Sequence, residues 1–247
     1  MSTDTTVLQS GKQRLSELSK FADQLEGRSA EDILNWAASR FGKGLTFATG
    51  FGAEGCLLIE LIGKNKLPID IFTLDTGLLF QETYHLWHRL EARYNITIRG
   101  IVPELDVDQQ AKTYGDRLWE RSPDQCCNIR KVIPLKATLA NVDAWVTAIR
   151  RDQTAERANA KVIEWDHKFN IVKVNPLVTW TKKDVWQHIV TEKVPYNPLH
   201  DNGYPSIGCW PCTSQVKPGE DDRAGRWRGN SKNECGLHSP AITSQQE

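Results

Sequence analysis

Cysteines carry the strongest chemical signal in this 247-residue chain. Four of its six cysteines form two pairs, the adjacent Cys126 and Cys127 and the later Cys209-Trp-Pro-Cys212. Thiolates bind zinc and iron–sulfur clusters, and a Cys-x-x-Cys turn lets two of them reach one centre. Adjacent cysteines suit neighbouring irons of a cluster, whereas a zinc ion usually takes two Cys-x-x-Cys turns. We therefore expect a 4Fe–4S cluster on these four residues, with zinc or a disulfide as the alternatives.

A fifth cysteine, Cys235, stands alone in a polar C-terminal stretch. Arg223, Arg226 and Arg228 come shortly before it. Neighbouring cations lower the pKa of a thiol and bind anions, so Cys235 is a candidate nucleophile toward an anionic substrate. The sixth, Cys56, lies in an apolar helical pattern and is expected to be a small buried side chain.

Two further basic positions could serve an anion. Lys131 follows Cys127 by four residues, which on a helix places both on one face. It could offset cluster charge or hold the substrate, and a solvated lysine is the alternative. Arg150 ends a predicted strand, at the sheet edge where doubly wound folds bind ligands.

A glycine-rich segment, Gly50-Phe-Gly-Ala-Glu-Gly55, follows a predicted strand and opens a predicted helix. Asp75 stands 20 residues beyond Gly55, so the pattern matches a dinucleotide-binding fingerprint. Amide groups at a helix N-terminus receive anions, and glycines allow the close approach. The segment therefore predicts a phosphate or sulfate site, with a tight turn as the alternative and a helix N-cap as the alternative for Asp75.

These residues are distributed over alternating strands and helices. Such alternation predicts an α/β fold with a doubly wound, mostly parallel sheet. Two of the predicted strands form a hairpin, and the chain from residue 195 is expected to be mostly loop. The expected helices are 12–26, 30–41, 56–63, 81–94, 127–140 and 181–192, and the expected strands are 45–49, 69–74, 96–102, 144–149, 161–165 and 170–174.

The composition argues against a nucleic-acid-binding, membrane-spanning or secreted protein. Lysine and arginine number 31, as do aspartate and glutamate, so no net charge favours nucleic acid or an anionic membrane. No apolar run is long enough to span a bilayer, and the N-terminus lacks the features of a secretory signal. We expect a cytoplasmic protein, where paired cysteines more often bind metals than form disulfides. The sequence leaves the oligomeric state open, a homo-oligomer included.

Taken together, the motifs resemble the assimilatory adenylyl-sulfate (APS) reductases, in the wider family that includes the 3′-phosphoadenylyl-sulfate (PAPS) reductases. The resemblance covers roughly residues 40–238. It rests on the two cysteine pairs, on Arg223-Ala-Gly-Arg226-Trp227 and on Glu234-Cys235-Gly-Leu-His238. Leu74-Asp75-Thr76-Gly77 and Arg150-Arg151-Asp-Gln153 also look like family segments.

The resemblance implies an adenine-nucleotide α-hydrolase-like fold, related to the ATP pyrophosphatases, with a 4Fe–4S cluster. It implies Cys235 as nucleophile, APS as substrate and thioredoxin or a similar dithiol protein as partner. The expected organisation is N-terminal helices over 1–42, a nucleotide-binding domain over 43–215 and a flexible segment over 216–247. The implied substrate-binding residues are Gly52, Ala53, Glu54, Leu74, Asp75, Thr76, Lys131, Arg150, Arg223, Arg226 and His238.

One departure concerns the nucleotide loop, which in the family usually reads Ser-Gly-Ala-Glu-Asp, whereas here Gly55 replaces the final acid. The expected reaction is thioredoxin-dependent reduction of APS to sulfite and AMP through a thiosulfonate on Cys235. The alternatives are a cluster-bearing PAPS reductase, an NAD-dependent dehydrogenase, a non-catalytic metal-binding module and a tRNA-thiolating relative.

Overall fold

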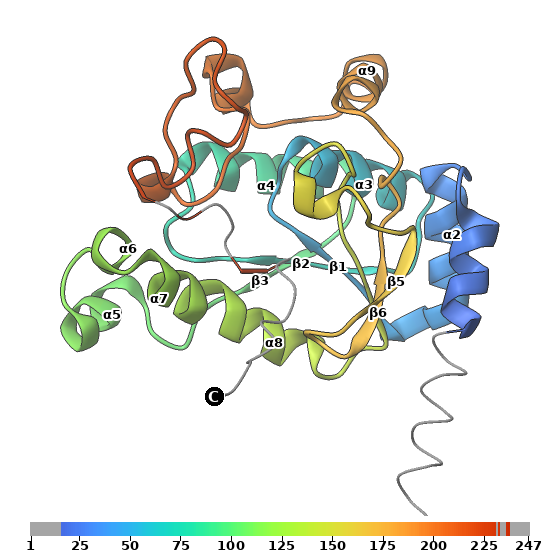
Figure 1. The fold of residues 1–247 in the computed structure, drawn as a ribbon, viewed down its shortest axis with the longest axis horizontal. Helices are drawn as coiled ribbons and strands as arrows, with labels where there is room; N and C mark the ends of the chain where they lie inside the picture. The colour runs from blue at the N-terminus through green and yellow to red at the C-terminus, as the bar shows by residue number, and fades with distance from the viewer. Residues whose placement is uncertain (1–15, 231, 233–235, 238–247) are drawn as a thin grey trace, which may run out of the picture.

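The structure, a computed structural model, describes residues 16–230, 232 and 236–237. One six-stranded sheet forms its centre (Figure 1). Its strands are short and rich in β-branched and aromatic residues, which favour extended backbone. They are β1 (Leu45–Thr49), β2 (Asp70–Leu74), β3 (Ile98–Ile101), β4 (Ala144–Val146), β5 (Ile163–Asp166) and β6 (Ile171–Val174).

The strand order is β3-β2-β1-β4-β6-β5. All neighbours pair in parallel except β5 and β6, which form an antiparallel hairpin at one edge. Parallel strands place their carboxyl ends on a common edge, so the loops after β1, β2 and β4 meet there. The predicted doubly wound, mostly parallel α/β fold and its terminal hairpin are confirmed.

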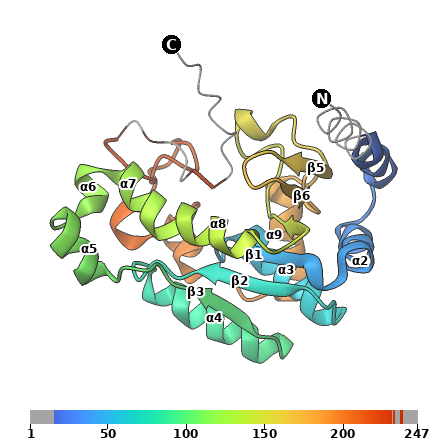
Figure 2. The ribbon, with the colours of Figure 1, turned by 90° about the horizontal axis from the view of Figure 1, so that it is seen from below.

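Helices cover both faces of the sheet (Figures 1 and 2). α3 and α4 lie on one face, α7 and α8 on the other, and α9 packs on α3. A helix over 16–25 precedes α2. The others are α2 (Ala30–Phe41), α3 (Ala53–Lys64), α4 (Gln81–Tyr94), α5 (Val107–Tyr114), α6 (Leu118–Arg121), α7 (Pro123–Cys127), α8 (Ile133–Leu139) and α9 (Lys182–Glu192).

The main core lies between the sheet and the α3 side. α3 is apolar nearly all round because it is covered by the sheet, α4 and α9. Leu57, Leu58 and Ile59 have no exposed surface. A smaller apolar cluster on the opposite face joins Phe72 to Leu135, Leu139, Trp145 and Ile171, and partly buried Leu237 packs against it.

Two predicted helix starts are confirmed by their caps. The Ser29 side chain accepts the Asp32 N–H at 3.0 Å, and Thr181 forms a reciprocal capping box with Asp184.

The helix predicted over 127–140 was wrong in its start and its continuity. α7 begins at Pro123, and a π-helical turn, Asn128–Val132, separates it from α8. Proline suits the first turn of a helix, so Pro123 starts α7 before the cysteines. Single π turns inside helices often mark functional sites. The predicted helix 56–63 begins earlier, at Ala53, and α5 and α6 were not predicted.

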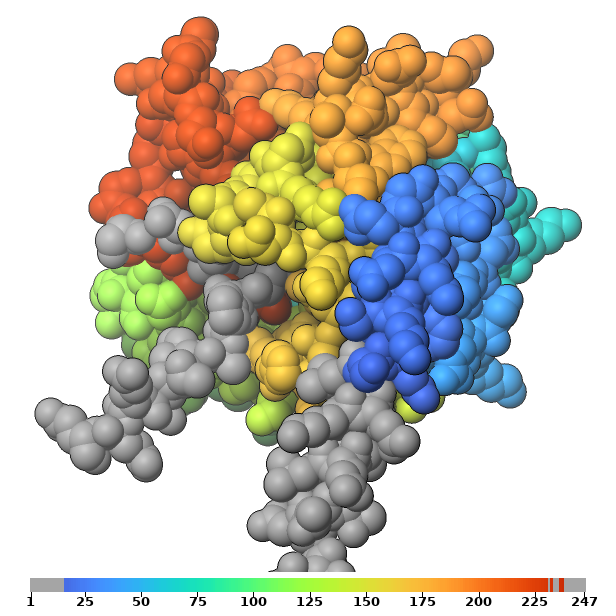
Figure 3. All heavy atoms as spheres, turned by 45° about the vertical axis from the view of Figure 1, so that its right-hand side comes forward, coloured from blue at the N-terminus to red at the C-terminus, as the bar shows by residue number. Residues whose placement is uncertain are grey.

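Residues 195–230 follow α9 along the upper side of the molecule in Figures 1 and 3. Apart from short 3-10 turns they have no regular structure, as the sequence predicted. Trp227 is buried, and its backbone N–H donates to the Cys212 carbonyl oxygen at 2.9 Å. The mobility expected for 216–247 stays a prediction. Among the described helices, none has the length and apolar character to cross a membrane.

The core makes a stability prediction. Leu58→Ala removes a side chain with no exposed surface and should lower the free energy of unfolding by about 2–5 kcal/mol. Val190→Ala, at a side chain that is 70% exposed, is the control and should change it by less than about 0.5 kcal/mol. Urea titrations of both variants measure this, and equal losses would contradict the assigned core.

Candidate active site at the carboxyl edge of the sheet

Two adjoining cavities follow the carboxyl edge of β1, β2 and β4. The first, of about 210 Å³, is called the cysteine-side cavity, and the second, of about 390 Å³, the arginine-side cavity. Gly50, Ile207 and Arg226 line both. The cysteine-side lining includes Thr49, Leu74, Thr76, Lys131, Cys209 and Leu237. The arginine-side lining includes Gly52, Ala53, Glu54, Arg150, Asp152, Lys182, Asp221, Asp222 and Arg223.

The turn between β1 and α3 forms the floor shared by the two cavities. Phe51 adopts a left-handed backbone with φ 58°, and its buried ring stacks on Trp87 at 5.7 Å. The Thr49 hydroxyl accepts the Phe51 N–H at 3.1 Å. Gly52 is the N-cap of α3, so the first amides of that helix point toward the arginine-side cavity.

Gly55 has a packing role in the same turn. A Cβ at this position would stand 2.7 Å from the Thr49 hydroxyl oxygen, too close for any side chain. The glycine that completes the dinucleotide-type pattern is therefore explained by the contact between α3 and β1.

An ion-pair network crosses the arginine-side cavity, from buried Arg150 to exposed Lys182 and Asp222. The Arg150 guanidinium pairs with the Glu54 carboxylate and lies 2.8 Å from an Asp152 oxygen. The other Asp152 oxygen accepts the backbone N–H of Lys182 at 2.9 Å, and the Lys182 ammonium lies 2.6 Å from Asp222. Burial strengthens such pairs, so Glu54 and Arg150 are held in place before any ligand binds.

Asp75 and Thr76, at the end of β2, point to different partners. The Asp75 carboxylate accepts the Tyr84 hydroxyl at 2.6 Å and the Gly77 N–H at 3.0 Å. It does not line either cavity. The Thr76 hydroxyl lies 3.3 Å from the Cys209 sulfur. Of these two predicted substrate residues, the structure brings Thr76 into the site and commits Asp75 to a turn.

The two cysteine pairs come together beside the cysteine-side cavity. Cys126 and Cys127 end α7, and Cys209 and Cys212 flank a 3-10 turn. Cys209 is tied to the loop after β2, where it forms an antiparallel bridge with Leu79. All four are free thiols, and only Cys212 is more than slightly exposed.

Burial raises the pKa of these cysteines, and the neighbouring charges either add to that shift or oppose it. Burial and the nearby Cys209, Cys127 and Cys126 thiolates raise the pKa of Cys212 to about 12. Burial also opposes ionisation of Cys209, but the Lys131 charge, the Thr76 hydrogen bond and Arg226 together hold the pKa of Cys209 below its ordinary value. Ionising these sulfurs together is therefore unfavourable unless a cation lies between them.

The π-helical turn after α7 places two cations at these sulfurs. Lys131 lines the cavity and donates a hydrogen bond to Cys209. Arg130 is buried and donates to the Thr76 carbonyl oxygen at 2.6 Å and to the Gln110 amide oxygen at 3.1 Å. The Gln110 amide nitrogen in turn lies 3.8 Å from the Cys126 sulfur. Lys131 thus reaches the site as predicted, although from a π turn.

The fit to a metal group can be tested on this arrangement. Within residues 16–230, 232 and 236–237, no three His, Cys, Asp or Glu side chains are arranged to hold one metal ion. Around zinc, sulfurs about 2.3 Å from the metal lie roughly 4 Å apart. A cuboidal cluster separates its thiolates further because each binds a different iron. Three of the four cysteines are buried and cations lie beside them, and thiolates are the ligands that such a cluster requires.

Residues 223–228 close the site from the C-terminal side. Thr213 and Arg226 form an antiparallel bridge, and the Arg226 guanidinium lies over the Trp227 ring at 4.5 Å. A Cβ on Gly208 would stand 2.3 Å from an Arg226 guanidinium nitrogen, so the guanidinium lies directly on the Gly208 backbone, next to Cys209. Arg223 and Arg226 therefore both reach the arginine-side cavity, as predicted.

Cys235 and His238 lie outside the described residues. Leu237, between them, is described and lines the cysteine-side cavity. Their predicted roles are therefore supported only by their covalent proximity to a cavity residue.

Comparison with known proteins identifies the family. The family model described as "Phosphoadenosine phosphosulfate reductase domain" matches residues 44–215. The chain belongs to the APS/PAPS reductase family. It is 47% identical over 215 residues to the adenosine 5′-phosphosulfate reductase of Halalkalibacterium halodurans, covering 87% of this chain and 93% of the relative. Adenosine 5′-phosphosulfate reductase 1 of Bacillus subtilis is 49% identical over 214 residues, or 85% of this chain and 91% of that one.

Comparison with solved structures supports the same family and fold. A PAPS reductase from Candida auris, in a phosphate complex, aligns with a TM-score of 0.72 and 33% identity over 81% of this chain and 96% of its own. Yeast FAD synthetase aligns with a TM-score of 0.51 at 16% identity, covering 80% of this chain and 68% of its own, and so shows the fold alone. The predicted adenine-nucleotide α-hydrolase-like fold is confirmed, and the NAD-dependent dehydrogenase is excluded as a reading of the glycine pattern.

Sequence reasoning missed several residues of this APS/PAPS reductase site. Arg130 and Gln110 join the cysteine helix to the rest of the site, yet neither had a signal beyond the position of Arg130 near the cysteines. Phe51 had only the glycines around it as a signal of unusual backbone. Cys56, in contrast, was predicted correctly. It has no exposed surface, and burial raises its pKa to about 12.

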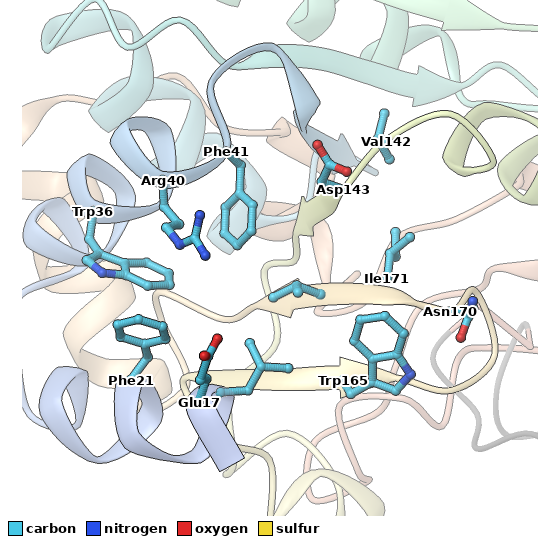
Figure 4. A pocket seen from close by; sticks show the side chains of 12 residues that line it. Glu17, Phe21, Trp36, Arg40, Phe41, Val142, Asp143, Trp165, Asn170 and Ile171 are labelled. Carbon is cyan, nitrogen blue, oxygen red and sulfur yellow. The ribbon is translucent and has the colours of Figure 1, made fainter. Parts of the chain in front are cut away.

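A third cavity lies away from the site (Figure 4). Figure 4 shows Trp36, Phe41 and Trp165 around it, with Arg40 among them and Asp143 at one side. Asp143 immediately precedes β4, so this cavity opens at the amino edge of the sheet. None of the predicted site residues that the structure describes lines it.

His200 yields a prediction about pH. It lines the arginine-side cavity against Trp186, and burial lowers its pKa below the ordinary value of 6.5. The unfolded chain then binds more protons at this residue, so its contribution to stability is present above pH 6.5 and is lost as pH falls. Urea titrations at pH 7.5 and 5 should show a smaller loss of unfolding free energy in His200→Gln than in wild type.

The control for this comparison is His88→Gln, at a side chain that is 74% exposed. It should keep the wild-type dependence on pH. The assignment fails if both substitutions change the dependence equally, or if His200→Gln leaves it unaltered.

Proposed function

We propose that this chain reduces APS to sulfite and AMP in sulfate assimilation, with Cys235 as the nucleophile and thioredoxin or a similar dithiol protein as the reductant. One observation carries the proposal. Lys131, Arg226 and Cys209 meet at a cavity that is also lined by Leu237, two residues after Cys235. An anion in that cavity is adjacent both to fixed cations and to the segment that bears the thiol. The reductases of H. halodurans and B. subtilis, named for the same substrate, support it.

The reaction follows from the charges of the site. APS is a sulfate joined to AMP through an anhydride. The Cys235 thiolate attacks sulfur, the bond from sulfur to the phosphate oxygen breaks, and AMP leaves with the electron pair. Lys131 and Arg226 stabilise the sulfonate oxygens during this transfer. A thiolate of the dithiol protein then attacks the Cys235 sulfur and releases sulfite, and its second thiol resolves the mixed disulfide.

The nucleotide fits the arginine-side cavity. The α3 N-terminus, begun by Gly52 and Ala53, offers amides to the phosphate. Glu54 and Arg150 are paired with each other, so they contribute fixed polar walls more than a net charge. Leu74, at the end of β2, supplies apolar surface to the neighbouring cavity.

Charge balance favours APS over PAPS. The arginine-side lining carries Arg150, Arg157, Lys182, Arg223 and Arg226 against four carboxylates. Lys182 and Arg150 already pair with three of those acids, Asp222, Glu54 and Asp152. A 3′-phosphate adds about two negative charges and would compete with these pairs. The PAPS reductase of C. auris keeps the second substrate as the alternative.

For the metal, we propose a 4Fe–4S cluster held by Cys126, Cys127, Cys209 and Cys212. Such a cluster supplies, when bound, a redox-capable group that links α7 to the 209–212 turn. The convergence of four thiols, three of them buried, supports it, as do the Lys131 hydrogen bond and the Gln110 amide near sulfur. Because Lys131 contacts Cys209, any group that holds the sulfurs in place also positions the Lys131 ammonium, which we propose binds the substrate. A cytoplasmic location, where thiols stay reduced, agrees with this use of cysteine.

The function is tested with the nucleophile. Cys235→Ser should keep nucleotide binding and visible absorbance but release no sulfite from APS, because a hydroxyl is a far weaker nucleophile than a thiolate near neutral pH. Wild type mixed with APS alone should gain one SO₃ on the peptide that contains Cys235. Sulfite production by Cys235→Ser, or an adduct on another cysteine, would contradict the mechanism. A PAPS specificity constant equal to or above that for APS would favour the alternative substrate.

The cluster makes a separate prediction. Replacing Cys126 or Cys209 by Ser should remove visible absorbance and most of about four irons per chain. Cys56→Ser, at a buried thiol outside the site, is the matched control and should keep both. Iron and zinc are measured after anaerobic purification. Stoichiometric zinc without iron would exclude the cluster.

A further inference from the structure

The described residues on either side of Cys235 contact the rest of the chain. Before it, the Lys232 ammonium pairs with Asp124 in the first turn of α7 and lies over the Trp227 ring at 5.4 Å. After it, the Gly236 carbonyl oxygen accepts a hydrogen bond from the Lys168 ammonium. Leu237 then packs against the apolar cluster under the cysteine-side cavity.

We propose that Lys168 and Leu237 are positioning residues that hold the backbone after Cys235 against the sheet and thereby present its thiol to the substrate. The inference rests on the proposed function. It assigns a role to the β5–β6 hairpin, because Lys168 lies in the turn between those strands. Nothing in the sequence motifs singled out this lysine.

The turn is itself rigidly supported, which a positioning role requires. Phe169 packs edge-to-face on buried Trp145, with ring centroids 5.5 Å apart. The Lys168 ammonium lies over the Phe169 ring at 5.6 Å. A cation held over an aromatic ring keeps its charge while its stem packs on apolar surface. The ammonium is therefore restrained where it meets the Gly236 oxygen.

The backbone conformation at Gly236 fits this attachment. Its φ is 81°, which an L side chain rarely adopts, so the chain turns here in a way that glycine allows. A Cβ at Gly236 would lie 3.6 Å from Val132, at the end of the π turn that carries Lys131. The turn directs Leu237 toward Leu135 and Trp145, whose side chains line the cysteine-side cavity with it.

The two chemical steps place opposite demands on this attachment. Attack on APS needs the Cys235 thiolate aligned with the sulfur, and AMP then leaves. Release of sulfite needs the dithiol protein to reach the same sulfur atom. Weakening the attachment should slow the first step and leave the second unchanged or faster, because misplacement of a reacting group is costly to rate.

The experiment separates these steps. Full-length Lys168→Ala, with its metal group bound, is mixed with APS in the absence of reductant, and AMP formation is followed over one turnover. We expect a rate about tenfold below wild type at saturating APS, with unchanged AMP affinity. Reduction of the preformed Cys235 adduct by thioredoxin should not slow. Lys168→Arg, which keeps a charged donor, should recover most of the rate.

Two further variants make the result decisive. Lys161→Ala, at an exposed lysine that precedes β5, is the matched control and should behave as wild type. Leu237→Ala should slow AMP formation and speed alkylation of Cys235 by a maleimide in the absence of nucleotide. The proposal is overturned if Lys168→Ala and Leu237→Ala both form AMP at the wild-type rate, or if both act only by weakening nucleotide affinity. If wild type itself forms no AMP from APS, the proposed function fails instead.

Discussion

The site depends on one buried guanidinium, that of Arg130. It donates to the Thr76 carbonyl at the end of β2 and to Gln110 on α5, so it holds the cysteine helix against the sheet. Thr76 in turn contacts the Cys209 sulfur. Burial lowers the pKa of Arg130, but an arginine stays charged, and its hydrogen bonds offset the desolvation. Without this side chain, the link between the two cysteine pairs would lose its shared anchor.

Around that anchor, charge is divided between two adjoining spaces. In the arginine-side cavity Arg150 and Lys182 are paired with carboxylates, whereas Lys131 and Arg226 lie beside sulfur at the smaller cavity. These paired charges offer polar contacts to the nucleotide with little net charge. In the proposed reaction, the cations beside sulfur attract the sulfate group of the substrate. Because Arg226 lines both spaces, it can contact a ligand that extends from one into the other.

The C-terminal chain completes the site from outside the central sheet. Trp227 and Arg226 attach it to the Cys209–Cys212 turn, and Gly236 and Leu237 attach it to the hairpin and the smaller apolar cluster. In the mechanism we propose, the intermediate passes to a second protein, and a nucleophile carried outside the central sheet could be reached without unfolding the core.

Local patterns and rare residues at short spacing predicted the family, the alternation of strands and helices, the helix starts near residues 30 and 181, and the cysteine pairs. Which residues share the site depends on contacts that form only in the folded chain. The π turn altered the helix expected to carry Lys131, Tyr84 and Gly77 engaged Asp75, and Arg130 and Lys168 gained partners 54 and 68 residues away. Such contacts join distant positions through packing and burial, and no periodicity along the chain encodes them.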